Sequence, residues 1–138
     1  MNQPITIAVD FDGTIVEHKY PAIGNELPFA IHTLKALQAK GHRLILWTSR
    51  AGKELDVAVN FCREKGLEFY AINKNYPEEK LTENVSRKII ADQYIDDRSL
   101  GGIPSWIEIY QMIHPEDSTG NKSKPSKWKW RTLRHSPS

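Results

Sequence analysis

Short apolar runs alternate with amphipathic stretches along most of the chain. Four runs are typical of strands buried on both faces of a parallel sheet, and they lie at residues 5–9, 42–50, 67–73 and 89–97. Three stretches follow helical spacing, at residues 27–41, 53–66 and 103–114, and the first two end at a glycine. Residues 15–26 have no period and predict a loop, and 76–87 are weakly helical at best.

Strands that alternate with helices predict an α/β fold. The expected architecture is a Rossmann-like, doubly wound parallel sheet with helices on both faces, formed by residues 1–114. Right-handed crossovers bring the carboxyl ends of all the strands to one edge of such a sheet, which is where ligands bind.

Composition is that of an ordinary protein of one domain. The chain has 138 residues, of which 39% are hydrophobic and 26% charged. It has no apolar run of about 18 residues and no secretion signal at its start, so we expect a cytoplasmic protein that does not enter a membrane. The one cysteine, Cys62, excludes an intrachain disulfide and a cysteine metal cluster.

Charge divides the chain at residue 115. Residues 115–138 hold six basic and two acidic side chains, a balance of +4 that leaves −2 for the rest. This Ser-, Pro- and Lys-rich segment predicts a disordered tail. Trp128 and Trp130 lie among its basic residues, a composition that fits single-stranded nucleic acid. The acidic body favours the alternatives, a solvating tail or one that docks on a neighbouring subunit.

Polar side chains follow every predicted strand and should meet at the ligand-binding edge. They are Asp10 and Asp12, then Thr48, Ser49 and Arg50, then Asn73, and finally Asp96 and Asp97. Four carboxylates in one crevice repel each other unless a cation intervenes, and Mg²⁺ is the usual choice in phosphate chemistry. Each motif alone has a plain structural explanation, so the prediction depends on their convergence.

The motifs "DFDGTI", "TSR" and "YIDD", in this order and each after an apolar run, resemble those of the haloacid dehalogenase (HAD) superfamily over residues 4–113. The resemblance implies a Rossmann-like core and Mg²⁺-dependent phosphoryl transfer through an aspartyl-phosphate. Asp10 would be the nucleophile and Asp12 the acid and base that serves the leaving oxygen and then water. An acid at the second position favours a phosphatase or phosphomutase within the superfamily.

The resemblance also assigns the remaining site residues. Thr48 would bind the transferring phosphoryl group, helped by backbone N–H groups around Phe11, Asp12 and Ser49. The metal set would comprise Asp10, the Asp12 carbonyl, Asp96 as a direct ligand, and Asp97 through water.

The resemblance further implies a lysine that steadies the nucleophile and the phosphate. Lys88 matches the spacing of small members of the superfamily. A straight strand over 89–95 would, however, put Lys88 roughly 25 Å from Asp96. Lys74 and Lys80 remain alternatives.

Neither long connection can fold as the cap domain that many HAD enzymes carry. We therefore expect an open, capless crevice with a flap at His18, Lys19 and Tyr20. The fork of Arg50 fits either a substrate phosphate or an acidic neighbour.

The expected function is that of a Mg²⁺-dependent phosphomonoester phosphatase. Its substrate would be a small molecule or an exposed phosphate on a larger one, and a homo-oligomer could cover the open site. The alternatives are a phosphotransferase or mutase of the same superfamily, and a non-catalytic module that binds phosphate and metal.

Overall fold

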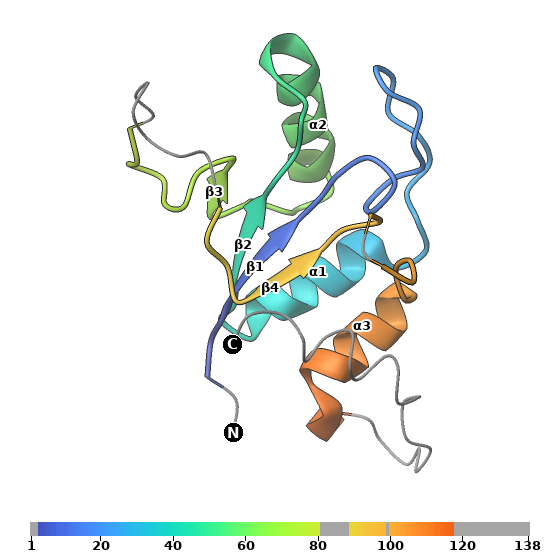
Figure 1. Cartoon of the computed structure of the whole chain (residues 1–138), viewed down its shortest axis with the longest axis vertical. Helices are drawn as coiled ribbons and strands as arrows, with labels where there is room; N and C mark the ends of the chain where they lie inside the picture. The colour runs from blue at the N-terminus through green and yellow to red at the C-terminus, as the bar shows by residue number, and fades with distance from the viewer. Residues whose placement is uncertain (1–2, 81–88, 99, 118–138) are drawn as a thin grey trace.

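A four-stranded, all-parallel sheet forms the centre of the fold (Figure 1). The computed structural model describes residues 3–80, 89–98 and 100–117. The strand order is β3-β2-β1-β4, so β1 has a neighbour on each side. The bounds are Thr6–Val9 for β1, Arg43–Leu46 for β2, Ala71–Ile72 for β3 and Gln93–Ile95 for β4. The α/β class and the parallel sheet predicted from the sequence are confirmed.

The register of the sheet aligns the ends of its three longest strands. Val9 pairs with Leu46 on one side and with Ile95 on the other. Residues that directly follow these strands, such as Asp10 and Asp96, therefore emerge at the same level. This alignment explains why motifs far apart in the sequence meet at one edge.

Three helices pack against one face of the sheet. They are α1 (Ala30–Ala39), α2 (Gly52–Glu64) and α3 (Trp106–Ile113), and a short 3₁₀ helix, η1 (Pro115–Asp117), follows α3. Their buried side chains join Ile7, Val9, Leu44 and Leu46 in one apolar cluster. None of the helices in the described parts of the chain is long and apolar enough to span a membrane.

The other face of the sheet is covered by different elements. Ala8, Ile45 and Ala71 pack there against Ile89, with Tyr94 at the margin. The expectation of helices on both faces is therefore met on one face only in the described residues. The order β1-β2-β3 runs in one direction, so right-handed crossovers put α1 and α2 on the same face. In the connection from β3 to β4, Ile89 packs on the opposite face, and residues 81–88 lie outside the described residues.

The two long connections, after β1 and after β3, contain short loops in the described residues. The segment that we call the flap, residues 17–26, is closed by a hydrogen bond from Glu17 N–H to Asn25 O (2.8 Å) and by a bridge between Val16 and Glu26. Residues 73–76 form bends and residues 77–78 a turn. Within the described ranges, neither connection forms a cap domain, as expected.

A chain of hydrogen bonds joins four elements at the amino edge of the sheet. Ile5 N–H donates to His42 Nδ1 (3.0 Å), and His42 Nε2 lies 2.8 Å from His114 Nε2. His114 Nδ1 lies 2.6 Å from Glu116 Oε2. Since His42 Nδ1 accepts, the proton of a neutral His42 is on Nε2 and is donated to His114. Both imidazoles are buried, so this link holds η1, and with it residues 115–117 of the predicted tail, against the core.

We expect acid to weaken this link and destabilise the fold. Burial, and secondarily His114, lowers the pKa of His42 below its usual range. The unfolded chain then binds the proton more tightly, so the stabilisation is complete above the ordinary histidine pKa of about 6.5 and is lost as the pH falls below it. Urea unfolding should show that the free energy of unfolding falls by about 1 kcal/mol between pH 8 and pH 5. This loss should be absent in His42→Asn and retained in the control His32→Gln, which changes an exposed histidine. An equal pH dependence in His42→Asn would contradict this assignment.

Candidate functional site

A cavity of about 480 Å³ opens at the carboxyl ends of the strands. Six of the residues predicted for the site line it, and the complete lining consists of Asp10, Asp12, His18, Tyr20, Trp47, Thr48, Ser49, Asp96, Asp97 and Arg98. The side chains of Phe11 and Arg50 are buried, although the role expected of Phe11 concerned its backbone N–H, and Lys88 lies outside the described residues. The convergence predicted from the strand ends is therefore found in the structure.

Three carboxylates in the cavity could hold a metal ion. Asp10, Asp96 and Asp97 each offer an oxygen, and these atoms lie within 4.8 Å of one another. Burial, reinforced by the charge of Asp96, raises the pKa of Asp10 to about 7. Burial and Asp96 also raise the pKa of Asp97. Oxygen donors that repel one another in this way suit a hard divalent cation, which would relieve the repulsion.

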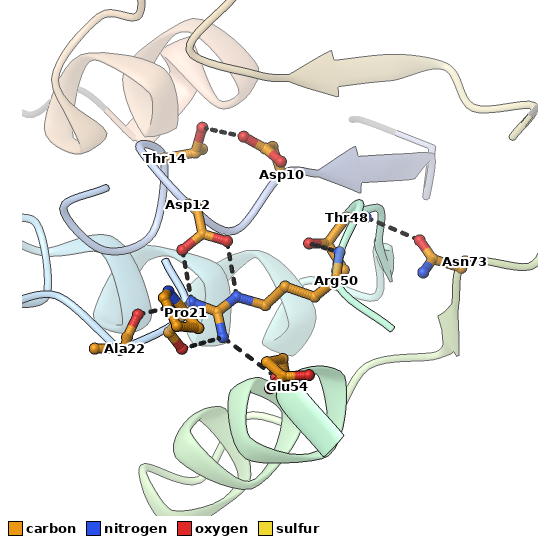
Figure 2. Close-up of polar contacts among 9 residues, drawn as sticks. All are labelled: Asp10, Asp12, Thr14, Pro21, Ala22, Thr48, Arg50, Glu54 and Asn73. Carbon is orange, nitrogen blue, oxygen red and sulfur yellow. Dashed lines mark hydrogen bonds and ion pairs between the residues drawn. The ribbon is translucent and has the colours of Figure 1, made fainter. Parts of the chain in front are cut away.

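Thr14 binds two members of this carboxylate triad, Asp10 and Asp97, although the sequence analysis assigned it no role. Its fully buried hydroxyl donates to Asp10 Oδ2 (3.2 Å, Figure 2) and accepts from the backbone N–H of Asp97 (3.0 Å). Its carbonyl accepts from Trp106 Nε1 (2.9 Å), which ties the motif to α3. The sequence signal for Thr14 was its place in the motif "DFDGT". A threonine directly after a glycine is also an ordinary turn residue, so the motif alone did not indicate this role.

The carboxylate of Asp12 is turned away from the triad and paired with Arg50 (Figure 2). Arg50 Nε donates to Asp12 Oδ2 and Nη2 donates to Asp12 Oδ1, each at 2.8 Å. Of the two roles that the sequence left open for Arg50, the structure shows the pairing with an acidic neighbour. The resemblance gave the metal role of Asp12 to its backbone carbonyl, and the engagement of its side chain with Arg50 is compatible with that expectation.

Arg50 uses all of its N–H groups on the protein. Besides Asp12, the guanidinium donates to the carbonyls of Pro21, Ala22 and Glu54 at 2.8–3.3 Å. It also lies over two aromatic rings, 5.1 Å from the Phe11 centroid and 5.0 Å from the Tyr20 centroid. A guanidinium has five N–H groups, and every one has a partner here. Arg50 therefore joins the first strand end, the flap and α2.

Thr48 lies at the end of the second strand and is fixed by its backbone. Its N–H donates to Asn73 Oδ1 (2.8 Å), and its hydroxyl oxygen accepts from the N–H of Arg50 (3.1 Å; Figure 2). Asn73 has a left-handed φ of 54°, which asparagine tolerates better than most residues. Asn73 thus positions Thr48 from the neighbouring strand rather than lining the cavity itself.

Gly13 is required by the approach of Asp97. Its φ is +84°, and a Cβ added there would lie 2.1 Å from Asp97 Oδ2 and 2.9 Å from Asp97 Cγ. Any side chain at position 13 would therefore displace a carboxylate of the triad. The glycine that the sequence presented as a turn residue also makes room for the acidic cluster.

Gly13→Ala is expected to weaken metal binding and to destabilise the fold by about 1–3 kcal/mol. Gly52→Ala is the matched control, because Gly52 also has a positive φ (+54°) but nothing lies within 4 Å of an added Cβ. Thermal unfolding followed over a Mg²⁺ titration separates the two effects. Stabilisation by Mg²⁺ should be lost in Gly13→Ala and kept in Gly52→Ala, and equal loss in both would refute the role given to Asp97.

The distance objection to Lys88 does not hold in this fold. Strand β4 begins only at Gln93, not at residue 89. The hydroxyl of Tyr94 donates to Ile89 O (2.7 Å) and accepts from Ala91 N–H (3.1 Å), so residues 89–91 are folded back beside Tyr94. Ile90 N–H donates to Asn75 Oδ1 (2.7 Å) in the loop after β3. The chain next to position 88 therefore does not run along a straight strand.

The two alternative lysines do not line the cavity. Lys74 is half-buried and Lys80 is exposed, and both lie in the loop that follows β3. That Lys88 is the lysine of the site therefore stays a prediction.

The rim of the cavity contains residues that sequence reasoning did not assign to the site. Arg98 is exposed and donates its N–H to Asp96 Oδ1 (3.0 Å). Trp47 also lines the cavity and keeps 36% of its surface exposed. His18 and Tyr20, which the sequence placed on a flap beside the crevice, line the cavity as expected, and Tyr20 is 52% exposed. Arg98 directly follows "YIDD" and Trp47 directly precedes "TSR", so proximity to the motifs was the available signal.

Comparison with known proteins gives one match to a solved structure and no assigned activity. A scan against protein-family models and a search of the curated proteins found no match. A solved structure, described as that of a conserved protein from Bacteroides thetaiotaomicron, is 57% identical, with a TM-score of 0.78. The match covers 88% of this chain and 100% of the Bacteroides chain. Identity at this level over a whole chain shows common descent, and the chain belongs to the same family as this conserved Bacteroides protein.

Proposed function

We propose that the chain is a capless phosphatase of the HAD superfamily that hydrolyses phosphomonoesters with Mg²⁺. The observation that carries the proposal is the placement of Asp10. It stands at the end of the central strand, in a cavity that it shares with Asp12 and Thr48, and within a triad completed by Asp96 and Asp97. The resemblance of "DFDGTI", "TSR" and "YIDD" to the HAD motifs assigns a role to each of these positions.

Asp10 would act as the nucleophile. One of its carboxylate oxygens attacks phosphorus, the bond from phosphorus to the leaving oxygen breaks, and an aspartyl-phosphate forms. The hydrogen bond from the Thr14 hydroxyl holds the Asp10 carboxylate in one orientation. Asp10, Asp96 and Asp97 would hold Mg²⁺, which supplies positive charge to offset the repulsion between the carboxylates and the anionic phosphate.

Asp12 would move the protons. Its protonated form gives a proton to the leaving oxygen, and its carboxylate then takes one from the water that attacks the aspartyl-phosphate. Released phosphate and a free Asp10 complete the cycle. The bidentate pairing with Arg50 holds Asp12 in one place, and a protonated Asp12 still has a carbonyl oxygen that can accept from the guanidinium.

The test is hydrolysis of p-nitrophenyl phosphate with Mg²⁺ and with EDTA, combined with trapping of the phosphorylated protein. We expect inorganic phosphate to be released with Mg²⁺ only, and mass spectrometry of quenched enzyme to find the phosphoryl group on the peptide that contains Asp10. Turnover that ignores EDTA would overturn the proposal. Phosphorylation of Asp10 without phosphate release would favour the phosphotransferase, and metal and phosphate binding without either would favour the non-catalytic module.

Lys88 is the lysine that we expect to support the reaction. Lys88→Ala should lower kcat/KM by about 10²-fold, as for other single donors to a transition-state anion, whereas Lys74→Ala and Lys80→Ala should change it less than about threefold. The measurement is steady-state hydrolysis of the same substrate by the three variants. A large loss in Lys74→Ala or Lys80→Ala alone would assign the role to that residue instead.

A further inference from the structure

The rim of the cavity holds two aromatic rings that the phosphoryl chemistry does not use. Tyr20 comes from the flap and Trp47 from the end of β2, and both line the same cavity as the carboxylates. They keep 52% and 36% of their surface exposed, although burying an aromatic side chain would stabilise the fold. The exposed surface of both rings is open to a ligand in the cavity.

The protein holds each ring firmly on one side. The guanidinium of Arg50 lies 5.0 Å from the centroid of Tyr20, and the same guanidinium binds the carbonyls of Pro21 and Ala22, the next two residues of the flap. Arg50 is 1% exposed, so this support for the ring is buried. Tyr20 is thus held in place before any ligand arrives.

Trp47 is held in a comparable way. Its ring meets Tyr94 edge to face, with centroids 5.6 Å apart and planes at 66°, and its backbone N–H donates to Val9 O (2.8 Å). Rings that are fixed by the protein but still exposed are preorganised to bind, because little conformational entropy is lost when a ligand stacks on them.

We propose that the site takes phosphomonoesters whose leaving group carries a planar aromatic ring, which stacks on Trp47 or Tyr20 while the phosphate faces Asp10. This inference rests on the proposed function and names its substrate class. A cavity of about 480 Å³ is within the range of sites for small ligands. Two sources share this chemistry, a nucleoside monophosphate, in which the ring is one sugar away from the phosphate, and an aryl phosphate, in which the ring bears the phosphate directly.

The experiment compares adenosine 5′-monophosphate, phenyl phosphate and glycerol 1-phosphate as substrates of the full chain with Mg²⁺. The two alkyl esters have similar leaving oxygens, so their kcat/KM ratio reports the binding of the nucleoside, and the change of this ratio in ring variants reports the stacking. We expect wild type to prefer adenosine 5′-monophosphate over glycerol 1-phosphate by about tenfold or more, the range that base–aromatic stacking supplies. Trp47→Leu and Tyr20→Leu should each reduce this ratio, mainly through a higher KM for adenosine 5′-monophosphate.

Two further variants separate stacking from damage to the fold. Trp47→Phe should recover most of the preference because it keeps a ring, and Phe29→Leu should change nothing because Phe29 is exposed (55%) but does not line the cavity. Loss of discrimination for phenyl phosphate alone in Trp47→Leu and Tyr20→Leu would identify an aryl phosphate as the source. Equal turnover of all three esters, or ratios unchanged in both leucine variants, would overturn the substrate class while the phosphatase stands. Failure of wild type on these esters and on p-nitrophenyl phosphate would instead refute the proposed function.

Discussion

Asp10→Asn is expected to abolish hydrolysis of phosphomonoesters, with a loss in kcat of at least about 10⁴-fold, and at the same time to stabilise the metal-free protein. The loss of activity follows from the proposed nucleophile, since an amide oxygen cannot form the aspartyl-phosphate. The shape of the side chain is kept, so Thr14 can still donate to an oxygen at this position. Steady-state turnover with Mg²⁺ measures the first effect.

The gain in stability has the opposite origin. In the folded protein the pKa of Asp10 is raised to about 7, first by burial and then by Asp96. A carboxyl whose pKa is raised by folding stabilises the fold when protonated and loses that contribution as the pH rises from about 4 to about 7. Asparagine carries no charge, so in EDTA at pH 8 the variant should unfold at a higher urea concentration than wild type. Its free energy of unfolding should be larger by up to about 2 kcal/mol, after allowance for solvent screening.

The pH and metal dependence of this gain distinguish it from general stabilisation. At pH 4 the two proteins should be almost equally stable, and Mg²⁺ at pH 8 should stabilise wild type more than the variant. Asp56→Asn, at an exposed position on α2, is the control and should change neither activity nor stability by more than about 0.5 kcal/mol. A variant less stable than wild type in EDTA at pH 8 would show that the Asp10 carboxylate is not under electrostatic strain.

The sequence predicted those parts of the site that depend on strand ends alone. Asp10, Thr48 and Asp96 directly follow apolar runs, and in a parallel sheet this position is enough to bring them together. The pairing of Arg50 with Asp12 could not be chosen from the sequence, because 38 residues separate the two and a guanidinium fits a carboxylate and a phosphate equally well. The flap decides the matter, since its carbonyls at Pro21 and Ala22 hold the guanidinium in place.

The extent of the fourth strand also depended on a contact that the sequence does not reveal. The apolar run over 89–97 predicts a strand of that length, but β4 covers only Gln93–Ile95. The hydroxyl of Tyr94 binds the backbone of Ile89 and Ala91, and these groups therefore do not join the sheet ladder. A side chain that competes with the backbone for hydrogen bonds changes an element boundary without changing the hydrophobic pattern.

Arg50→Met is expected to destabilise the fold by about 3–5 kcal/mol, the second large effect that the structure predicts. The side chain of Arg50 is fully buried and that of its partner Asp12 is 12% exposed, so methionine would leave a largely buried carboxylate without its counter-charge. The carbonyls of Pro21, Ala22 and Glu54 would lose their donor as well. The stability of Arg50→Lys should lie between those of wild type and Arg50→Met, because one ammonium group cannot reach all of these acceptors.

The control for Arg50 is an arginine–carboxylate ion pair at the surface. Arg63 Nε lies 2.6 Å from Glu68 Oε2, yet the two side chains are 52% and 65% exposed, so Arg63→Met should change stability by less than about 1 kcal/mol. A double-mutant cycle in urea isolates the buried pair: Asp12→Asn combined with Arg50→Met should be more stable than Arg50→Met alone, because no unpaired charge remains. If Arg50→Met destabilised the protein no more than Arg63→Met, the flap and Asp12 would be held by other contacts. If Arg50→Met lost much stability and Asp12→Asn partly restored it, Arg50 would support the fold chiefly by balancing the charge of Asp12, which the proposed mechanism requires.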